Sequence, residues 1–326
     1  MPRPRSFDPA LVLACSLGLA LLSLGPAGCR TSPGPGDERV LRVTNTGSVD
    51  FDDLSGELAH ELLRERGYRV DTTTYRLSSL AAEALARGDA DIGVGAMPVY
   101  LKALSMGASI RLIGEHVANP HRLVARRGVS CAELGTEGIA SQGEGAATTI
   151  LARAWLSESC PEHPARFVFV QQSENRLAAL MSGRIAASVL KMPELVKLDQ
   201  LAPDRFSVMA DFSRTWPELI VVGLFANARW AEQHEEVVEL YLQARQEAAE
   251  RLATADALVE LAARILGPSN DWAVVTRMYL DIGAWNALIP SAARLERTLD
   301  FFGRHAGIDG LEADAVTGLQ AAWQDK

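Results

Sequence analysis

The segment Arg87-Gly88-Asp89-Ala90-Asp91-Ile92-Gly93-Val94-Gly95-Ala96-Met97-Pro98 predicts the end of a helix, a short strand and the start of another helix. Gly88 suits the helix end, because glycine enters the left-handed backbone region at little cost. Ile92 and Val94 are typical of a buried parallel strand. Pro98 fits the first turn of a helix, where its missing N–H has no partner to lose.

The same pattern returns at Ser182-Gly183-Arg184-Ile185-Ala186-Ala187-Ser188-Val189-Leu190-Lys191-Met192-Pro193. Aligned without a gap, the matching pairs are Gly88 and Gly183, Val94 and Val189, Met97 and Met192, and Pro98 and Pro193. Two matching strand-to-helix connections indicate two α/β lobes of related design, and a chance match of common residues is the alternative. Ligands bind at the carboxyl ends of strands in open α/β sheets. We therefore expect a cleft lined by Gly95, Ala96 and Met97 on one side and by Lys191 on the other.

Length and composition are those of a globular protein with one large domain or two ordinary ones. The chain has 326 residues, of which 48% are hydrophobic and 22% charged. Its net charge of −9 argues against a nucleic-acid partner.

The N-terminus has the pattern of an export signal. Arg3 and Arg5 precede an apolar run over residues 10–24, which is short for a membrane span and suits a secretory signal. Small residues directly before Cys29 resemble the bacterial lipobox, in which that cysteine is lipidated, although Pro26 departs from it. Ordinary cleavage after Ala27, or an uncleaved anchor, is the alternative. We predict a signal peptide over 1–28 and a flexible Pro/Gly-rich tether over 29–38, with the protein lipid-anchored on the periplasmic side of the envelope.

Two cysteines remain after the signal is removed and Cys29 is lipidated. Cys131 and Cys160 form an even pair, which an oxidising compartment would join in a disulfide. The loop-entropy relation gives such a bridge roughly 3–4 kcal/mol of stabilisation. Two unpaired thiols are the alternative.

Strands and helices are predicted to alternate along most of the chain. Strands are expected at 40–44, 68–75, 92–94, 110–113 and 123–125, and again at 138–140, 167–170, 185–190, 206–209 and 219–225. After Asn227 the pattern becomes helical to the end. This alternation indicates an α/β fold with mostly parallel sheets, helices on both faces and extra C-terminal helices.

The loop after the strand near residue 139 is the most site-like stretch. Its glycines let the backbone approach a ligand, and the following helix offers free N–H groups. The candidate ligand contacts are Ser141, Gln142, Gly143, Glu144, Gly145 and Ala146. A plain strand–helix turn is the alternative, and Glu144 argues against a multiply charged anion at this position.

Other strand ends supply further candidates. Gly47, Ser48 and Asp50 follow the first strand, and Phe51 could stack on a ligand. A helix N-cap is the alternative role for Asp50 and Asp53. The remaining candidates are Gln171 and Gln172, then Lys191, which would meet an anion or stay solvated, and Trp216, an aromatic wall or a core residue.

Catalytic and cofactor signatures are missing from the sequence. It has no Gly-x-Ser-x-Gly, no His-Glu-x-x-His and no Cys/His ligand cluster, and His116 and His121 are only a weak metal pattern. We therefore expect no enzyme activity, no cofactor and no metal, and a monomeric protein.

Taken in order, these motifs resemble an ABC-transporter solute-binding protein. The resemblance rests on four features: the lipobox-like leader, the first strand running into Gly47-Ser48, the turn Gly88-Asp89-Ala90-Asp91 and the glycine-rich loop near mid-chain. The chain is most similar to the nitrate/sulfonate/taurine and thiamine-precursor-binding group. In the second repeat Ala186 stands opposite Asp91, which departs from the family-like pattern and weakens inference about Lys191.

The resemblance implies the two-lobed type II periplasmic-binding fold. Lobe one would comprise 39–122 plus 224–326 and lobe two 123–223, with hinge strands near 123–125 and 219–225. Hinge closure around a small solute, sulfonate/taurine-like or pyrimidine-like, would precede docking on an ABC permease. The alternatives are an enzyme on the same fold, similar to chorismate dehydratase, and a sensory or accessory binding lipoprotein.

Overall fold

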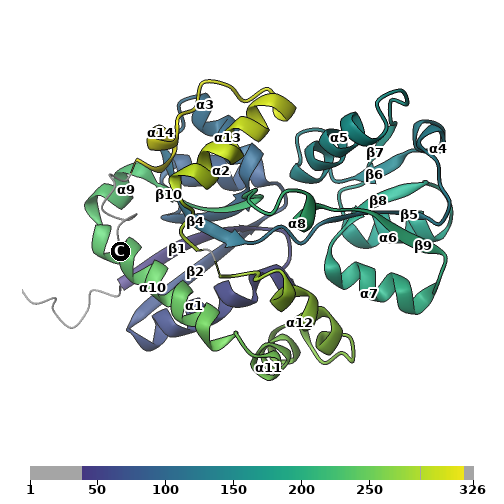
Figure 1. Ribbon diagram of the computed structural model, residues 1–326. Coiled ribbons are helices and arrows are strands. Elements are labelled where there is room, and N and C mark those ends of the chain that lie inside the picture. Colours follow the sequence, from purple (N-terminus) through teal and green to yellow (C-terminus); the bar gives the residue numbers. More distant parts are fainter. Residues whose placement is uncertain (1–38, 287, 319–326) are drawn as a thin grey trace, which may run out of the picture. The chain divides into compact units, whose positions relative to one another are not determined.

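A computed structural model describes residues 39–286 and 288–318 (Figure 1). The expected signal peptide, Cys29 and the tether lie outside these residues. Within the described residues, no helix combines the length and the apolar character needed to cross a membrane.

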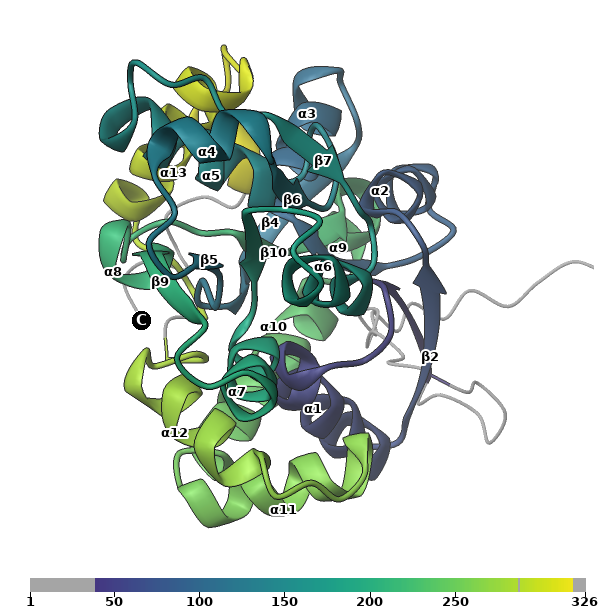
Figure 2. The ribbon, with the colours of Figure 1, turned by 90° about the vertical axis from the view of Figure 1, so that its right-hand side faces the viewer.

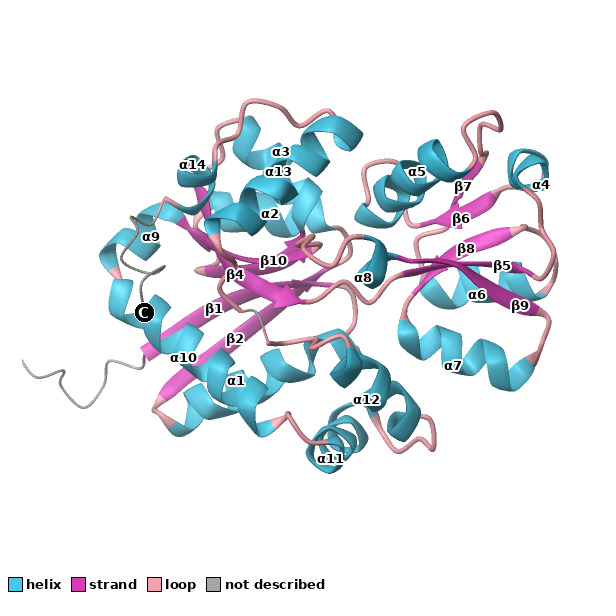
Figure 3. Ribbon diagram, viewed as in Figure 1, coloured by secondary structure: helices cyan, strands magenta, loops and turns pink. Residues whose placement is uncertain are grey.

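The first sheet is built mainly from the N-terminal part of the chain (Figure 3). Its strand order is β2-β1-β3-β10-β4. β1 pairs in parallel with β2 and β3, whereas β10 runs antiparallel between β3 and β4. The strands are β1 (Arg39–Thr46), β2 (Tyr68–Tyr75), β3 (Ile92–Ala96), β4 (Ile110–Val117) and β10 (Val222–Asn227).

The second sheet repeats the same arrangement. Its order is β7-β6-β8-β5-β9, with β6 parallel to β7 and β8, and β5 antiparallel to β8 and β9. The strands are β5 (Arg122–Arg126), β6 (Ile139–Ser141), β7 (Phe167–Phe169), β8 (Ala187–Leu190) and β9 (Phe206–Asp211). β3 and β8 occupy equivalent places, so the two quoted segments are structural counterparts.

Each sheet contains one antiparallel strand. The polypeptide enters that strand directly after it leaves the other sheet. β4 leads through 118–121 into β5, and β9 leads through 212–221 into β10. The α/β fold class is confirmed: each sheet is mixed, with four strands that point in one direction and one strand that runs against them. The reason is that each exchanged strand is antiparallel to both of its neighbours.

Helices surround both sheets (Figure 3). They are η1 (Phe51–Asp53), α1 (Leu54–Glu65), α2 (Ser78–Arg87), α3 (Met97–Ser105), α4 (Cys131–Thr136), α5 (Ala147–Ser159), α6 (Ser173–Met181), α7 (Met192–Leu201), α8 (Phe212–Thr215), α9 (Ala228–Gln233), α10 (Glu235–Arg251), α11 (Ala255–Leu266), α12 (Trp272–Asp281), α13 (Ala292–Ala306) and α14 (Ala313–Thr317).

The local geometry of the repeated segments follows the sequence rules. Gly88 and Gly183 have φ angles of 82° and 72°, in the left-handed region that favours glycine. Pro98 and Pro193 stand in the first turn of α3 and α7. A proline there loses no hydrogen bond, so each strand passes directly into a helix.

One hydrophobic cluster joins residues from both sheets' helices. Phe51 and Leu54 pack with Met192 and Val196 of α7 and with side chains of α11 and α12. Figures 1 and 2 show α7 beside α12, and Gln200 donates to Asp271 across this contact at 2.6 Å. Burying each large apolar side chain here contributes about 1.5–3 kcal/mol. The C-terminal helices therefore connect α7 to the first sheet.

A disulfide joins Cys131, at the start of α4, to Cys160, at the end of α5. These are the two cysteines that the sequence selects. Their Cα atoms are 5.6 Å apart. The bridge ties α4 to α5 around β6.

Candidate functional site

Loops that follow strands of the two sheets meet at charged and polar side chains. The Lys191 ammonium, directly after β8, lies 2.5 Å from an oxygen of Asp50 and 2.6 Å from one of Asp52. Gln171, after β7, donates to the carbonyl of Arg76, after β2, at 3.2 Å. Strand ends far apart in the sequence thus form one junction, as expected for α/β sheets.

The Asp50 carboxylate has two roles. It caps η1 by accepting from the backbone N–H of Asp52 at 2.9 Å, and it also pairs with Lys191. The side chain of Asp53 completes a capping box by accepting from the N–H of Asp50 at 2.9 Å. The N-cap and the charge contact are therefore combined in one residue.

Asp52 is held by two aromatic residues of the C-terminal helical region. The Tyr279 hydroxyl donates to its carboxylate, and the Trp285 indole N–H donates to its carbonyl at 3.2 Å. Asp52 is 6% exposed, so its carboxylate has little freedom to rotate away. Its second oxygen is left to face Lys191.

A series of buried hydrogen bonds supports the turn formed by residues 50–53. His116 Nε2 lies 3.1 Å from an oxygen of Asp53, and Arg245 lies 3.3 Å from Nδ1 of the same imidazole. Because a guanidinium can only donate, Nδ1 must accept, and Nε2 carries the proton that Asp53 receives. Asn45 also donates to Asp53 at 3.3 Å.

Burial and hydrogen bonding determine the protonation states of His116 and Asp53. Burial lowers the pKa of His116, so the imidazole stays neutral. For Asp53, burial alone would raise the pKa, but the hydrogen bonds of His116 and of the Asp50 N–H, together with the charge of Lys191, bring it below the ordinary value. Asp53 is therefore a fixed acceptor for the turn that presents Asp50 and Asp52.

The Lys191 ammonium is strongly held in its charged form. Burial would lower the pKa of Lys191, yet the attraction of Asp50 and Asp52 raises it well above its ordinary value. Burial raises the pKa of Asp50 to about 7, against the opposing attraction of Lys191. The junction holds more carboxylates than cations.

A cavity of about 690 Å³ opens beside Asp50 and Lys191. Its walls come from the loop before η1, from α6 and α7, and from α11, α12 and the loop between them. They are Val49, Asp50, Phe51, Glu174, Leu177, Lys191, Pro193, Glu194, Lys197, Gln200, Leu201, Ile265, Leu266, Asp271 and Trp272. Charged groups thus line a space with substantial apolar surface.

A second cavity, of about 680 Å³, is mainly apolar. It lies where α2 and α3 of the first sheet approach the start of α5 and the end of α13. Its walls are Ser79, Ala82, Glu83, Ala86, Pro98, Val99, Lys102, Ala103, Met106, Gly107, Ala108, Gly145, Ile150, Ala306 and Ile308. Pro98 and Gly145 come from strand-end loops of different sheets.

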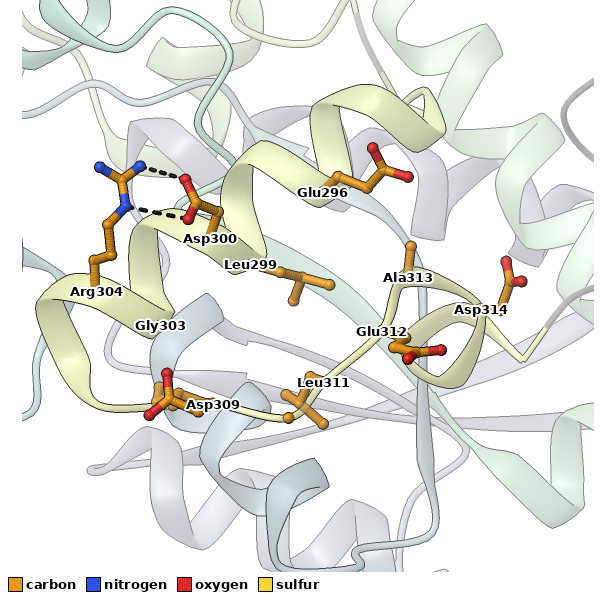
Figure 4. A pocket seen from close by; sticks show the side chains of 12 residues that line it. Glu296, Leu299, Asp300, Gly303, Arg304, Asp309, Leu311, Glu312, Ala313 and Asp314 are labelled. Atoms are coloured by element: carbon orange, nitrogen blue, oxygen red, sulfur yellow. Dashed lines mark hydrogen bonds and ion pairs between the residues drawn. The ribbon is translucent and has the colours of Figure 1, made fainter.

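A third cavity, of about 540 Å³, is formed by α13 and the segment that follows it (Figure 4). Arg304 points to Asp300 there and pairs with it. No residue of the strand-end loops lines this cavity, which is rich in carboxylates. We therefore place the candidate site at the strand ends and not at α13.

The 141–146 loop adopts a self-contained turn. Ser141 is buried and accepts from the Thr149 hydroxyl at 2.7 Å. Glu144 is exposed and pairs with Arg153 at 2.5 Å, whose hydrogen bond lowers the pKa of Glu144. Gln142 and Gly145 are exposed, whereas Gly143 and Ala146 are half-buried. Gly145 lines the apolar cavity.

The loops after β1 and β3 differ in accessibility. Gly47 and Ser48 are exposed, and Ala96 is half-buried. Gly95 is buried against the Tyr100 ring, and Met97 is 0% exposed. The expectation that Met97 lines a cleft is therefore wrong, because its side chain turns into the core beneath α3.

The two aromatic candidates pack within the protein. Phe51 is 1% exposed, with its ring centroid 4.6 Å from that of Tyr279 and 5.5 Å from that of Trp272. Trp216 stacks on Phe212 and meets Phe301 edge-on at 5.0 Å. Phe51 is too buried to stack on a solute, whereas Trp216 is half-buried, so its role as an aromatic wall stays a prediction.

Of the remaining candidates, Lys191 and Asp50 meet directly, and Gln171 reaches the first sheet's loops. Gln172 is exposed and accepts from Asn175. Within the described residues, no group of three or more His, Cys, Asp or Glu is placed to hold a metal ion.

Several residues of the site were not predicted from the sequence. Asp52 follows the first strand, two positions after the candidate Asp50, and this position was the available signal. Tyr279 and His116 lie in other segments, and Tyr279 is 227 positions from Asp52. Nothing in a single sequence pairs residues at that separation.

Solved structures share this arrangement of sheets. The ligand-binding component of an ABC-type import system from Staphylococcus aureus, with zinc bound, superposes with a TM-score of 0.68 at 13% identity, covering 86% of this chain and 96% of that chain. The alkanesulfonate-binding protein SsuA from Xanthomonas axonopodis pv. citri, bound to MOPS, gives 0.66 at 18% identity, covering 85% and 96%. The nitrate-binding protein NrtA from Synechocystis PCC 6803 gives 0.62 at 12% identity, covering 88% and 91%. The fold is thus that of the periplasmic binding proteins.

Comparison of the sequence with family models assigns the chain to a narrower group than the fold does. Residues 60–255 match the family model described as NMT1/THI5 like, and the chain belongs to that family. None of the curated proteins that were compared matches the chain.

Proposed function

We propose that this chain is an exported, lipid-anchored solute-binding protein that delivers a small organic solute to an ABC importer. Residues 1–28 would be the lipoprotein signal and 29–38 the tether. The first lobe would comprise 39–122 plus 224–326, and the second lobe 123–223. The family membership and the importer components among similar structures support this proposal.

One observation carries the proposal: charged side chains from the strand ends of both sheets converge beside a cavity. Lys191 contacts Asp50 and Asp52, and the adjoining space of about 690 Å³ is large enough for a small organic molecule. A molecule there would touch residues of both lobes.

The mechanism would be physical rather than chemical. The hinge strands expected near 123–125 and 219–225 fall largely in β5 and β10, and the connections that enter these strands, at 118–121 and 212–221, would bend with them as hinges. A solute favours the closed form only through contacts that are stronger in that form. Contacts made with Asp50 on one lobe and with Lys191 or Gln171 on the other would have this property.

The solute would be sulfonate/taurine-like or pyrimidine-like. A polar head group would meet the charged junction, while the strand-end loops 47–50, 141–146 and 171–172 would contribute further contacts. The exposed Ser48, Gln142 and Gln172 are available for such hydrogen bonds.

A thermal-shift screen on the chain without residues 1–28 tests the proposal. The panel would contain sulfonates, pyrimidines, amino acids and oxyanions. A ligand at one hundred times its Kd adds about 2.7 kcal/mol, which raises Tm by about 5–10 °C in a domain of this size. If no compound shifts Tm while a chorismate-like compound is turned over, the binding function is refuted in favour of an enzyme.

The anchor has its own test. Labelled palmitate should enter the wild-type chain and not a Cys29→Ser variant, and the variant should leave the membrane fraction. Equal labelling of both chains would show that Cys29 carries no lipid.

A further inference from the structure

The Asp50–Asp52 pair already binds one primary ammonium group, that of Lys191. The two carboxylate oxygens lie 2.5 and 2.6 Å from Nζ, so the ammonium donates charge-assisted hydrogen bonds to both. Both carboxylates belong to one turn of the first sheet, whereas Lys191 comes from the second sheet. The ammonium therefore arrives from across the junction, at the place where a solute would lie.

The acidic pair is built without help from Lys191. Asp50 is fixed by its capping contacts, and Asp52 by Tyr279 and Trp285. If the Lys191 side chain moved out, two oriented carboxylates would remain together. Because Lys191 opposes the rise that burial causes in the pKa of Asp50, loss of the ammonium would make Asp50 take up a proton unless another cation took its place.

The adjoining cavity also favours a cation. Of the side chains that line it, four are carboxylates, namely Asp50, Glu174, Glu194 and Asp271, and two are ammonium groups, namely Lys191 and Lys197. Apolar surface from Leu266 and Trp272 faces the same space. An organic cation matches this combination of negative charge and apolar wall better than an anion does.

We infer that the solute carries a protonated amine or amidine group, which binds between Asp50 and Asp52 in place of the Lys191 ammonium. This inference rests on the proposed function and names the class of solute. Lys191 is then an internal competitor that occupies the subsite until the solute arrives. An aliphatic amino sulfonate has the required ammonium group, and a plain sulfonate does not.

Matched probes and variants test this inference. Isothermal titration at pH 7.5 would compare taurine with ethanesulfonate, and benzamidine with benzamide, because the first member of each pair carries a cationic nitrogen at this pH. The wild-type chain would be set beside Lys191→Met and beside Lys102→Met, which removes an exposed charge of α3 that does not line this cavity. Asp50→Asn would serve as the reciprocal variant, because asparagine retains the N-cap.

We expect the amine member of a pair to bind at least tenfold more tightly than its partner. A tethered competitor acts at a millimolar effective concentration, so Lys191→Met should tighten amine binding by tenfold or more. Lys102→Met should change Kd by less than threefold, and Asp50→Asn should weaken amine binding at least tenfold.

Other results separate the two proposals. Tight binding of an amine-free anion that is lost in Lys191→Met overturns this inference, since Lys191 is then the anion ligand, and leaves the solute-binding function standing. No binding of any probe class to any variant overturns the function itself. If Lys191→Met does not fold, the Asp50→Asn comparison decides, because unchanged amine affinity there also overturns the inference.

Discussion

Replacing Asp53 with alanine should remove the support on which the acidic turn depends. Among the described residues, three donors converge on its carboxylate: the N–H of Asp50 at 2.9 Å, His116 at 3.1 Å and Asn45 at 3.3 Å. Each buried donor left without a partner costs about 1–3 kcal/mol. The nearby Arg245 also loses a compensating charge. We expect the free energy of unfolding to fall by about 4 kcal/mol.

Urea unfolding followed by tryptophan fluorescence would measure this loss, and Tm should fall by about 8 °C. Asp53→Asn keeps one acceptor oxygen and should lose less than Asp53→Ala. Asp256→Ala is the control, since this exposed first-turn residue of α11 should change stability by about 0.5 kcal/mol at most.

The reasoning would be refuted by an Asp53→Ala variant that loses less than about 1 kcal/mol. It would also be refuted by equal losses in Asp53→Ala and Asp256→Ala. Either result would mean that water or a rearranged side chain satisfies the three donors.

Three further perturbations follow from single features of the structure. Cys131→Ser opens a loop of 29 residues and should cost roughly 3–4 kcal/mol, with reduction of the wild type giving the same loss in urea unfolding. Burial lowers the pKa of His60 to about 3, so stability present above pH 6.5 is lost as pH falls toward 3. His60→Gln should remove about 2 kcal/mol of that loss at pH 5, as measured by unfolding at each pH. Gly95→Ala places a Cβ against the Tyr100 ring and should destabilise by about 1–3 kcal/mol in the same assay, whereas an unchanged midpoint would mean that the ring moves freely.

Local backbone rules account for the parts of the fold that the sequence predicted well. A left-handed glycine and a first-turn proline each depend on a few neighbouring residues, so Gly88, Pro98, Gly183 and Pro193 could be placed without knowing the rest of the chain. For the part of the chain after Asn227 the sequence indicated helix without placing the breaks. The structure divides it at His234 and Thr254, which have non-helical backbone angles.

The direction of a side chain was harder to predict than its element. Phe51 and Met97 were both correctly placed at strand ends, yet both are buried. A loop residue next to a helix start can turn either to the cleft or to the core. For Phe51 the choice was made by Trp272 and Tyr279, which pack on its ring from a distant segment.

The sequence by itself determined the succession of strands and helices and the existence of two related α/β units, because both depend on local conformational preference and hydrophobic pattern. Only the tertiary structure decided that β5 and β10 are exchanged between the sheets. It also decided that Lys191, 141 positions from Asp50, meets the acidic turn of the other sheet. Burial makes such distant contacts strong, and no local pattern encodes which distant partner will be buried beside a charge.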